Sequence, residues 1–285
     1  MLGEIRQYQI NRGMVESYLE VWNKQIFPNH KLYGIRIIGA WLDRSQNQLT
    51  WIRVFDNAED RRVKLLEAYN NAPERTAVVP VASYHMAHAY VRVCDGDWFQ
   101  PLESPDPAIL KTKAADAGRA AMERRRAAGA PPARHDALGW GLNPGRIGEI
   151  RQYSLNRGTT ADGRSMVESY RDVWNRQIFP NHKLYGIKII GGWYDSNLNQ
   201  LTWIRVFDSE EDRRVKLLEA YNHAPERTLV VPVANYHTAS SYVRVCDAEV
   251  FRPADKPDPS VLQTPVADDA RKYAAARGGV SSPAH

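Results

Sequence analysis

An internal duplication constrains the fold of this 285-residue chain more than any other feature. Residues 3–13 recur as residues 148–158, and after a seven-residue insertion at 159–165 the copies continue without a gap, residues 14–99 against residues 166–251. Of these 86 later positions, 66 are identical and 20 differ. A repeat of this length is a whole domain, so the pattern predicts two similar domains rather than a solenoid of short units.

The duplication divides the chain. We predict a first repeat at 1–99, a Pro/Ala/Arg-rich linker at 100–147, a second repeat at 148–251 and a tail at 252–285 whose Gly/Ser/Pro end is disordered. Segment 111–134 carries seven basic and two acidic residues, which accounts for the net charge of +5. The repeats themselves are balanced, so the charge pattern does not indicate a nucleic-acid-binding face.

Several protein classes are excluded by what the sequence lacks. No apolar run reaches the roughly 18 residues of a membrane helix, so we expect no membrane span. The N-terminus lacks the pattern of a secretory signal and there are only two cysteines, so we expect a cytoplasmic protein with buried, unreactive thiols. HExxH, paired CxxC, EF-hand, GxGxxG, P-loop and GxSxG motifs are all missing, so we predict no metal and no nucleotide cofactor.

Each repeat shows the same order of elements. Period-two and helical hydrophobic patterns predict a β-α-β-β-α-β order, with Pro28 ending the first helix and Pro73 the second. Asn57, or Ser209 in the second copy, is expected to cap the second helix. In the first repeat the predicted elements are strand 3–10, helix 14–27, strand 31–42, strand 48–56, helix 57–71 and strand 78–95.

This order is the ferredoxin-like α+β fold, in which both helices cover one face of a four-stranded antiparallel sheet. The other face carries apolar side chains and needs a partner. The attached second repeat can supply it, so we expect the two sheets to pair into a barrel within one chain, as a pseudo-dimer. Pairing between chains, in a larger homo-oligomer, is the alternative.

Short motifs in this order resemble the NIPSNAP family of the dimeric α+β barrel superfamily. They are the Glu4-x-Arg6-x-Tyr8 opening strand, the Gly39-x-Trp41 strand end before a hairpin, and the third strand that leads into Asp60-Arg61-Arg62. The resemblance covers both repeats and implies ferredoxin-like units paired into an α+β barrel. It implies no settled activity, because the superfamily includes cofactor-free monooxygenases, cyclases, decarboxylases, haem enzymes and ligand binders.

One position departs from the family pattern. The third strand of the family ends in Trp-x-Tyr, whereas this chain has Arg53-x-Phe55 and, in the second copy, Arg205-x-Phe207. An arginine in place of a core aromatic residue marks these two positions as candidate ligand contacts.

Polar and aromatic side chains share strand faces by the period of two. Arginine can hold a carboxylate with two hydrogen bonds and tyrosine can donate one, so the first-strand face is a candidate ligand cradle; a structural ion pair is the alternative. Aromatic rings beside an arginine suit a planar anionic ligand, and a core face is again the alternative. The candidate binding residues are Glu4, Arg6, Trp51, Arg53, Glu149, Arg151, Trp203 and Arg205.

Histidines and tyrosines are the candidate proton carriers. His85 and His237 occupy matching positions in the predicted last strand, where burial would lower the pKa, and we predict them as catalytic residues together with Tyr8 and Tyr153. A hydrogen-bonded structural histidine is the alternative. His88 is added as a binding candidate, because it becomes Ser240 in the second copy while Met86 becomes Thr238, so the two pockets are expected to differ.

We predict that His30 and His182 lie in a loop. There they can serve equally well as turn or cap residues or as catalysts. The pattern as a whole favours an enzyme without metal or nucleotide, of isomerase, cyclase, lyase or cofactor-free oxygenase type, acting on a small anionic or carbonyl-containing metabolite. A non-catalytic binding or scaffold protein is the alternative. A haem enzyme, with His85 or His237 as axial ligand, is a further one.

Overall fold

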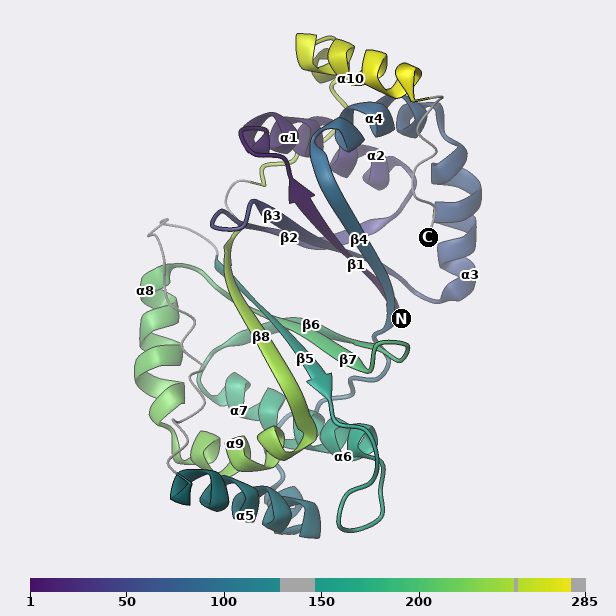
Figure 1. Cartoon of the computed structure of the whole chain (residues 1–285). Helices are drawn as coiled ribbons and strands as arrows, with labels where there is room; N and C mark the ends of the chain where they lie inside the picture. The colour runs from purple at the N-terminus through teal and green to yellow at the C-terminus, as the bar shows by residue number, and fades with distance from the viewer. Residues whose placement is uncertain (129–146, 249–250, 278–285) are drawn as a thin grey trace. The chain divides into compact units, whose positions relative to one another are not determined.

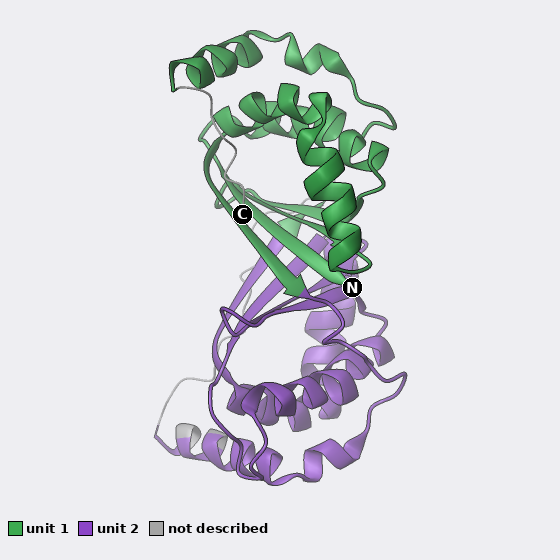
Figure 2. Cartoon of the chain, turned by 90° about the vertical axis from the view of Figure 1, so that its right-hand side faces the viewer, with its two compact units in different colours: residues 1–94, 246–285 green, residues 95–245 purple. Residues whose placement is uncertain are grey.

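The computed structural model describes residues 1–128, 147–248 and 251–277. The chain forms two compact units that do not follow the repeat boundaries (Figure 2). Unit 1 joins residues 1–94 to residues from 246 onward, and unit 2 is residues 95–245. The predicted linker is therefore described only in part, since 129–146 lie outside the described residues, as do the last residues of the tail, 278–285.

Each unit has the predicted α+β composition (Figure 1). The elements of unit 1 are β1 (Leu2–Ile10), α1 (Val15–Val21), π-helical η1 (Trp22–Ile26), α2 (Phe27–Leu32), β2 (Arg36–Asp43), β3 (Gln48–Phe55), α3 (Ala58–Arg61), π-helical η2 (Arg62–Ala68), the 3₁₀ turn η3 (Tyr69–Asn71), α4 (Pro73–Tyr84), β4 (Met86–Asp95), the 3₁₀ turn η8 (Pro259–Leu262) and α10 (Pro265–Ala276).

Unit 2 repeats this design. Its elements are the 3₁₀ turn η4 (Pro107–Lys111), α5 (Lys113–Ala127), β5 (Ile147–Leu155), α6 (Met166–Val173), π-helical η5 (Trp174–Ile178), α7 (Phe179–Leu184), β6 (Lys188–Asp195), β7 (Gln200–Phe207), α8 (Glu210–Arg213), π-helical η6 (Arg214–Ala220), the 3₁₀ turn η7 (Tyr221–His223), α9 (Pro225–His237) and most of β8 (Thr238–Asp247).

The sheet of unit 1 has the strand order β4-β1-β3-β2, and the sheet of unit 2 has the order β8-β5-β7-β6. In unit 1, β3 pairs antiparallel with both β1 and β2, which places Glu4 opposite Arg53 and Arg6 opposite Trp51. The helices lie on one face of each sheet (Figure 1). Because side chains alternate along a strand, Glu4, Arg6 and Tyr8 all point to this helix-covered face.

The predicted strand over 78–95 is wrong in its first half, because residues 73–84 form α4 and the strand begins at Met86. Pro73 stands in the first turn of α4, where its missing N–H costs no hydrogen bond, so it begins a helix as well as following one. The buried side chains Val78, Val81 and Ala82 follow helical spacing. Packing of this face outweighs the strand preference of the valines.

The first helix is longer than predicted. Pro28 does not end it, since α1, η1 and α2 follow one another without a break to Leu32. Proline is tolerated in the first turn of α2 because the preceding π-turn changes which carbonyls accept hydrogen bonds. The predicted strand at residue 31 therefore begins only at Arg36. The cap at Asn57 is confirmed: its Oδ1 accepts a hydrogen bond of 2.9 Å from the Asp60 N–H, and Ser209 does the same for Asp212.

The segments that follow each repeat are packed arms rather than free linkers. In unit 2, α5 lies against α9, and Gly118 allows a close approach, since a Cβ at this position would come within 2.8 Å of the Pro232 carbonyl oxygen. In unit 1, α10 lies against α4, with Ala267 and Ala270 fully buried in the core of that unit. The basic segment 111–134 thus begins as part of a packed helix, and its end lies outside the described residues.

Candidate functional site

Each unit has a cavity between its sheet and its helices. The first cavity, of about 740 Å³, belongs to unit 1, and the second cavity, of about 360 Å³, belongs to unit 2. The strand residues predicted as a ligand cradle line these cavities together with residues of the covering helices. In the first cavity the predicted lining residues are Glu4, Arg6, Tyr8, Trp51 and Arg53, and in the second they are Glu149, Arg151, Tyr153, Trp203 and Arg205.

A buried carboxylate organises the first cavity. Glu4 is 1% exposed, and its Oε2 accepts hydrogen bonds from Arg53 Nε at 2.7 Å and Arg6 Nη1 at 3.2 Å. Its Oε1 accepts from Arg61, with both Nε and Nη2 at 2.6 Å. Burial raises the pKa of a carboxyl group, but here the three guanidinium charges outweigh burial and hold the pKa of Glu4 below its usual value. Glu4 is therefore ionised and fully engaged.

His30 lies in this site and not in the loop that we predicted. It is in α2, 2% exposed, and its Nδ1 lies 2.7 Å from the Ile26 carbonyl oxygen. Its Nε2 lies 2.8 Å from Arg53 Nη1. A guanidinium group can only donate, so Nε2 accepts and Nδ1 carries the proton. Burial, and then the charge of Arg53, lower the pKa of His30 well below its usual value, which keeps the ring neutral.

Tyr8 supplies the cavity with a hydroxyl group. Its oxygen accepts a hydrogen bond of 2.5 Å from Arg6 Nε, and no acceptor for its own proton is found among the described residues. The hydroxyl can therefore donate to a ligand while the guanidinium stabilises negative charge on the oxygen. Tyr153 and Arg151 repeat this pair at 2.7 Å in the second cavity.

The cavities have more cationic than anionic groups. The first is lined by Arg6, Arg53, Arg61 and Arg75, against the single carboxylate of Glu4. Arg75 makes no ion pair with a described carboxylate, and its only hydrogen bond to a described residue is a long one of 3.4 Å from Nη1 to the Asn70 carbonyl oxygen. Arg75 is partly buried, and the lining has three more positive than negative groups, so it favours an anionic occupant.

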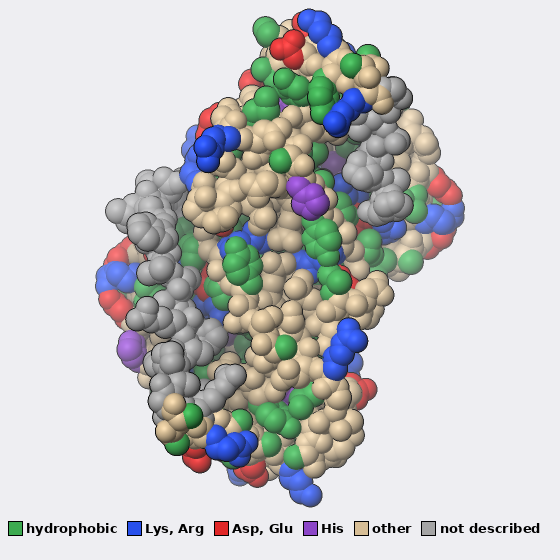
Figure 3. Space-filling view, viewed as in Figure 1, with side chains coloured by type: hydrophobic (Ala, Val, Ile, Leu, Met, Phe, Trp, Pro, Cys, Tyr) green, Lys and Arg blue, Asp and Glu red, His purple; other side chains and the backbone are tan. Residues whose placement is uncertain are grey.

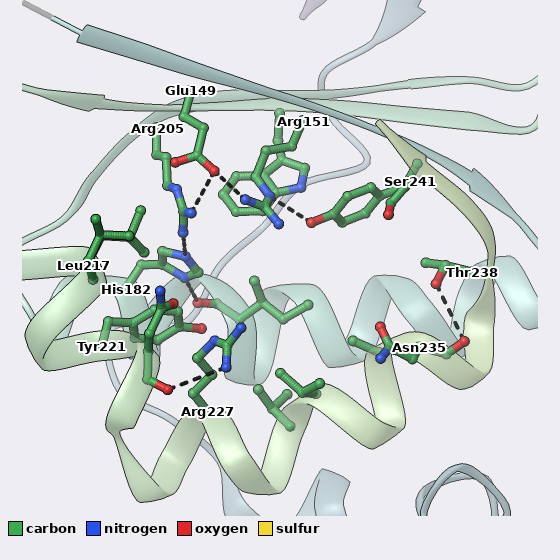
Figure 4. Close-up of a pocket in the computed structure, with 18 of the residues that line it drawn as sticks. Glu149, Arg151, His182, Arg205, Leu217, Tyr221, Arg227, Asn235, Thr238 and Ser241 are labelled. Carbon is green, nitrogen blue, oxygen red and sulfur yellow. Dashed lines mark hydrogen bonds and ion pairs between the residues drawn. The ribbon is translucent and has the colours of Figure 1, made fainter. Parts of the chain in front are cut away.

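The second cavity has the same plan with one change in its charges (Figure 4). Glu149 Oε1 accepts from Arg151 and from Arg205, the latter at 2.7 Å, while His182 accepts from Arg205 at 2.8 Å. Arg213, the counterpart of Arg61, turns instead to Glu210, which replaces Ala58 of the first repeat, and its Nε stays 3.6 Å from Glu149 Oε2. That oxygen receives no hydrogen bond from any described residue.

The predicted catalytic histidines lie elsewhere. His85 follows the last residue of α4 and His237 ends α9, so neither is in a strand as predicted, and neither lines a cavity. In His85, Nδ1 lies 2.7 Å from the Val81 carbonyl oxygen and Nε2 lies 2.9 Å from Ser17 Oγ. His237 makes the equivalent contacts with Val233 and Ser169 in unit 2. Each ring therefore links two helices of its unit.

His88, the other histidine predicted to bind, is exposed in β4 and is not part of the first cavity lining, although the neighbouring Met86 is. On the face shown in Figure 3, Lys and Arg side chains are scattered among acidic ones rather than gathered in one patch.

Arg61, Tyr69 and Arg75 are among the cavity residues that we did not predict as site residues. Charged residues at a helix start are usually solvated, and the signal available for Arg61 was its position one helical turn beyond the strand that carries Arg53. Tyr69 and Arg75 flank Pro73, where we expected a helix end instead of two helices meeting over the sheet. Burial raises the pKa of Tyr69 to about 12, so its hydroxyl stays protonated.

Within residues 1–128, 147–248 and 251–277, no helix is long and apolar enough to cross a membrane. The same part of the chain contains no group of three or more His, Cys, Asp or Glu side chains placed to hold a metal ion.

Comparison with known proteins gives a family and a fold. The NIPSNAP family model matches residues 3–90. A proposed monooxygenase from Lactobacillus acidophilus superposes with a TM-score of 0.53 and 10% identity, over 86% of this chain and 92% of its own. A proposed monooxygenase from Fusobacterium nucleatum superposes with a TM-score of 0.51 and 7% identity, over 86% of this chain and 91% of its own.

An uncharacterised NIPSNAP domain protein from Burkholderia xenovorans is 23% identical over 36% of this chain and all of its own, with a TM-score of 0.33. No curated protein sequence matches the chain. The superpositions confirm the fold class, α+β with tandem ferredoxin-like repeats of the dimeric α+β barrel type.

Proposed function

We propose that each unit binds a small organic anion in its cavity and acts on it by acid–base chemistry. Both units are treated alike because residues 3–90 belong to the NIPSNAP family and the second repeat is a close copy of them. One observation carries the proposal: each cavity is lined by four arginines and a single carboxylate. A carboxylate ligand would offset part of this excess positive charge. The aromatic and aliphatic remainder of the lining suits a small hydrocarbon or ring attached to it.

The proposed chemistry uses the tyrosine–arginine pair. Tyr8, or Tyr153, would donate its proton to a carbonyl oxygen of the bound molecule, and the phenolate so formed would take up a proton from the neighbouring carbon, which leaves the enol and restores the tyrosine. Arg6, or Arg151, would stabilise the transient phenolate. Enol formation is a common first step of isomerisation, cyclisation, elimination and cofactor-free oxygenation. The two superposed proteins are proposed monooxygenases.

Binding without catalysis is the second candidate function, and a specific observation favours it. Arg53 is paired with Glu4, and His30 Nε2 is occupied by Arg53, so the carboxylate and the imidazole of the first cavity are already engaged and neither is free to accept a proton from carbon. The predicted catalytic histidines do not line either cavity. A carrier of small carboxylates would need no such base.

One experiment separates these functions. The chain is mixed with a panel of 2-oxo and aromatic carboxylates in D₂O, and proton NMR measures both binding and exchange of the hydrogens next to the carbonyl group. An enzyme exchanges these hydrogens, and Tyr8→Phe with Tyr153→Phe lowers the exchange rate at least 100-fold while binding changes less than tenfold. Saturable binding without exchange supports the carrier. No saturable binding of any member contradicts both.

A further inference from the structure

The two cavities differ at three lining positions where the repeats diverge. Ser83, Met86 and Ala89 line the first cavity, and their counterparts Asn235, Thr238 and Ser241 line the second. The remaining lining positions shared by the two cavities are identical in sequence. Substitution is therefore concentrated on one side of an otherwise constant pocket, opposite Leu217 and Tyr221 in the view of Figure 4.

At these three positions the side chains of the second cavity are the more polar ones. Met86 and Ala89 are partly buried and pack against the hydrophobic core of unit 1. At the corresponding places the second cavity presents the hydroxyl groups of Thr238 and Ser241, and an amide replaces the hydroxyl of Ser83. A hydroxyl group on a ligand would lie unpaired against Met86 and Ala89, whereas it can be hydrogen-bonded in the second cavity.

A fourth difference lies at the charged end of the cavity. Both oxygens of Glu4 accept hydrogen bonds from arginines, because Arg61 binds Oε1. In the second cavity Glu210 holds Arg213 away, so Glu149 Oε2 is buried without a hydrogen-bond donor from the described residues (Figure 4). This oxygen has almost no accessible surface, so the difference reaches a ligand through the position of Arg213 and the added charge of Glu210.

We infer that the two cavities select different carboxylates: the first takes an anion with an apolar chain, and the second takes a polyhydroxylated anion. This inference rests on the proposed function, since it assumes that each cavity binds an organic anion through its arginines. The first cavity excludes hydroxyl groups by leaving them unpaired, and the second disfavours an alkyl chain because the side chains of Asn235, Thr238 and Ser241 would lose water without gaining a partner.

Hexanoate and gluconate are matched probes, since both are six-carbon monocarboxylates and only gluconate carries hydroxyl groups. Isothermal titration calorimetry of the full chain counts the sites for each acid. Methionine labelled with ¹³C at its methyl group reports on the first cavity through Met86. We expect one site for each acid, a Met86 methyl shift with hexanoate alone, and a preference of at least tenfold for the matched acid in each cavity.

Exchange variants extend the test, because each introduced residue already occurs in the other repeat. Ser83→Asn with Met86→Thr and Ala89→Ser should move the hexanoate stoichiometry from one to zero and that of gluconate from one to two. The reverse set, Asn235→Ser with Thr238→Met and Ser241→Ala, should give the opposite change. Binding of both acids in both cavities with affinities within twofold overturns this inference and leaves the proposed function standing. Absence of saturable binding for both acids also overturns this inference, whereas the proposed function is overturned only if no member of the wider carboxylate panel binds.

Discussion

Arg53 Nη1 lies 2.8 Å from Nε2 of His30, and both side chains are buried under the helices of unit 1. Burial and the positive charge of Arg53 both disfavour protonation of this histidine. A carboxylate partner would instead favour the protonated form. Arg205 and His182 repeat the contact at the same distance in unit 2. The relationship has a direct consequence for the pH dependence of stability.

Stability should fall as the pH drops below the ordinary histidine pKa. Burial lowers the pKa of His30 and His182 well below the usual value, so between pH 6.5 and 5 the unfolded chain binds protons that the folded chain does not. Folding stability is therefore lost as the pH falls, by about 1 kcal/mol for each of these histidines between pH 7 and 5.5. Urea unfolding at the two pH values measures the loss.

The control is His30→Gln with His182→Gln, in which the glutamine oxygen can still accept from the arginine. This variant should be less stable at pH 7 and should show a smaller loss on acidification. A wild-type stability that is constant or rises from pH 7 to 5.5 would contradict the neutral assignment. The carboxylates act in a lower range, because the pKa of Glu149 is lowered to about 2 and its contribution is lost only below about pH 4.5.

The two buried glutamates should differ in their importance for stability. Glu4→Gln leaves Arg53, Arg6 and Arg61 without their shared carboxylate, and breaking a buried ion pair typically costs about 3–5 kcal/mol. Glu149→Gln should cost less, since Arg213 keeps Glu210 as its partner. Chemical unfolding of both variants tests the order. Equal losses of unfolding free energy in the two variants would show that the pairing of Arg213 with Glu210 has no energetic effect.

Glu210 should weaken anion binding in the second cavity. Removing this carboxylate, as in Glu210→Ala, returns Arg213 to the arrangement that Arg61 has in the first cavity. One negative charge fewer near the cavity should tighten the binding of a carboxylate by about threefold to tenfold, equivalent to about 1 kcal/mol. The matched variant Ala58→Glu should weaken binding in the first cavity by a similar factor. Calorimetric titration measures both, and unchanged affinities contradict the charge argument.

The arm helix α5 should contribute to the stability of unit 2. Gly118→Leu forces a side chain against the Pro232 carbonyl oxygen, and overpacking of this kind costs about 1–3 kcal/mol. Lys113→Leu, at an exposed position of the same helix, is the control and should change the free energy of unfolding by less than about 0.5 kcal/mol. If Gly118→Leu is as stable as the control, α5 does not pack on α9 in solution.

The sequence was sufficient to predict the tandem α+β repeats and the strand face of the cavities. Alternation placed Glu4, Arg6 and Tyr8 together, and the Arg53-x-Phe55 departure pointed to the arginine at the centre of the site. Prediction failed where packing decides between helix and strand: the Val-Val-Pro-Val run at 78–81 has strand preference, yet it covers the sheet as a helix. That error moved His85 from a helix end to a strand.

The helix-borne part of the site could not be derived from local patterns. Arg61 and Arg75 come from helices whose position over the sheet depends on the whole fold, and a charged residue at a helix start is usually solvated. The packing of α5 on α9 and of α10 on α4 was not predicted for a similar reason. The sequence of an Ala-rich helix carries little information about which helix it contacts. Pairing of the two sheets within one chain stays a prediction, for which native mass spectrometry should give a single 32.4 kDa species.

Calorimetric titration of the full chain with a panel of aliphatic and aromatic monocarboxylates tests the central claim most directly, with wild type compared to Arg75→Gln combined with Arg227→Gln. These arginines line the cavities without taking part in the ion pairs around Glu4 and Glu149, so the variant should fold. The account predicts saturable binding of at least one acid to the wild type and affinity at least tenfold weaker in the variant. No saturable binding to the wild type, or equal binding by both proteins, would contradict it.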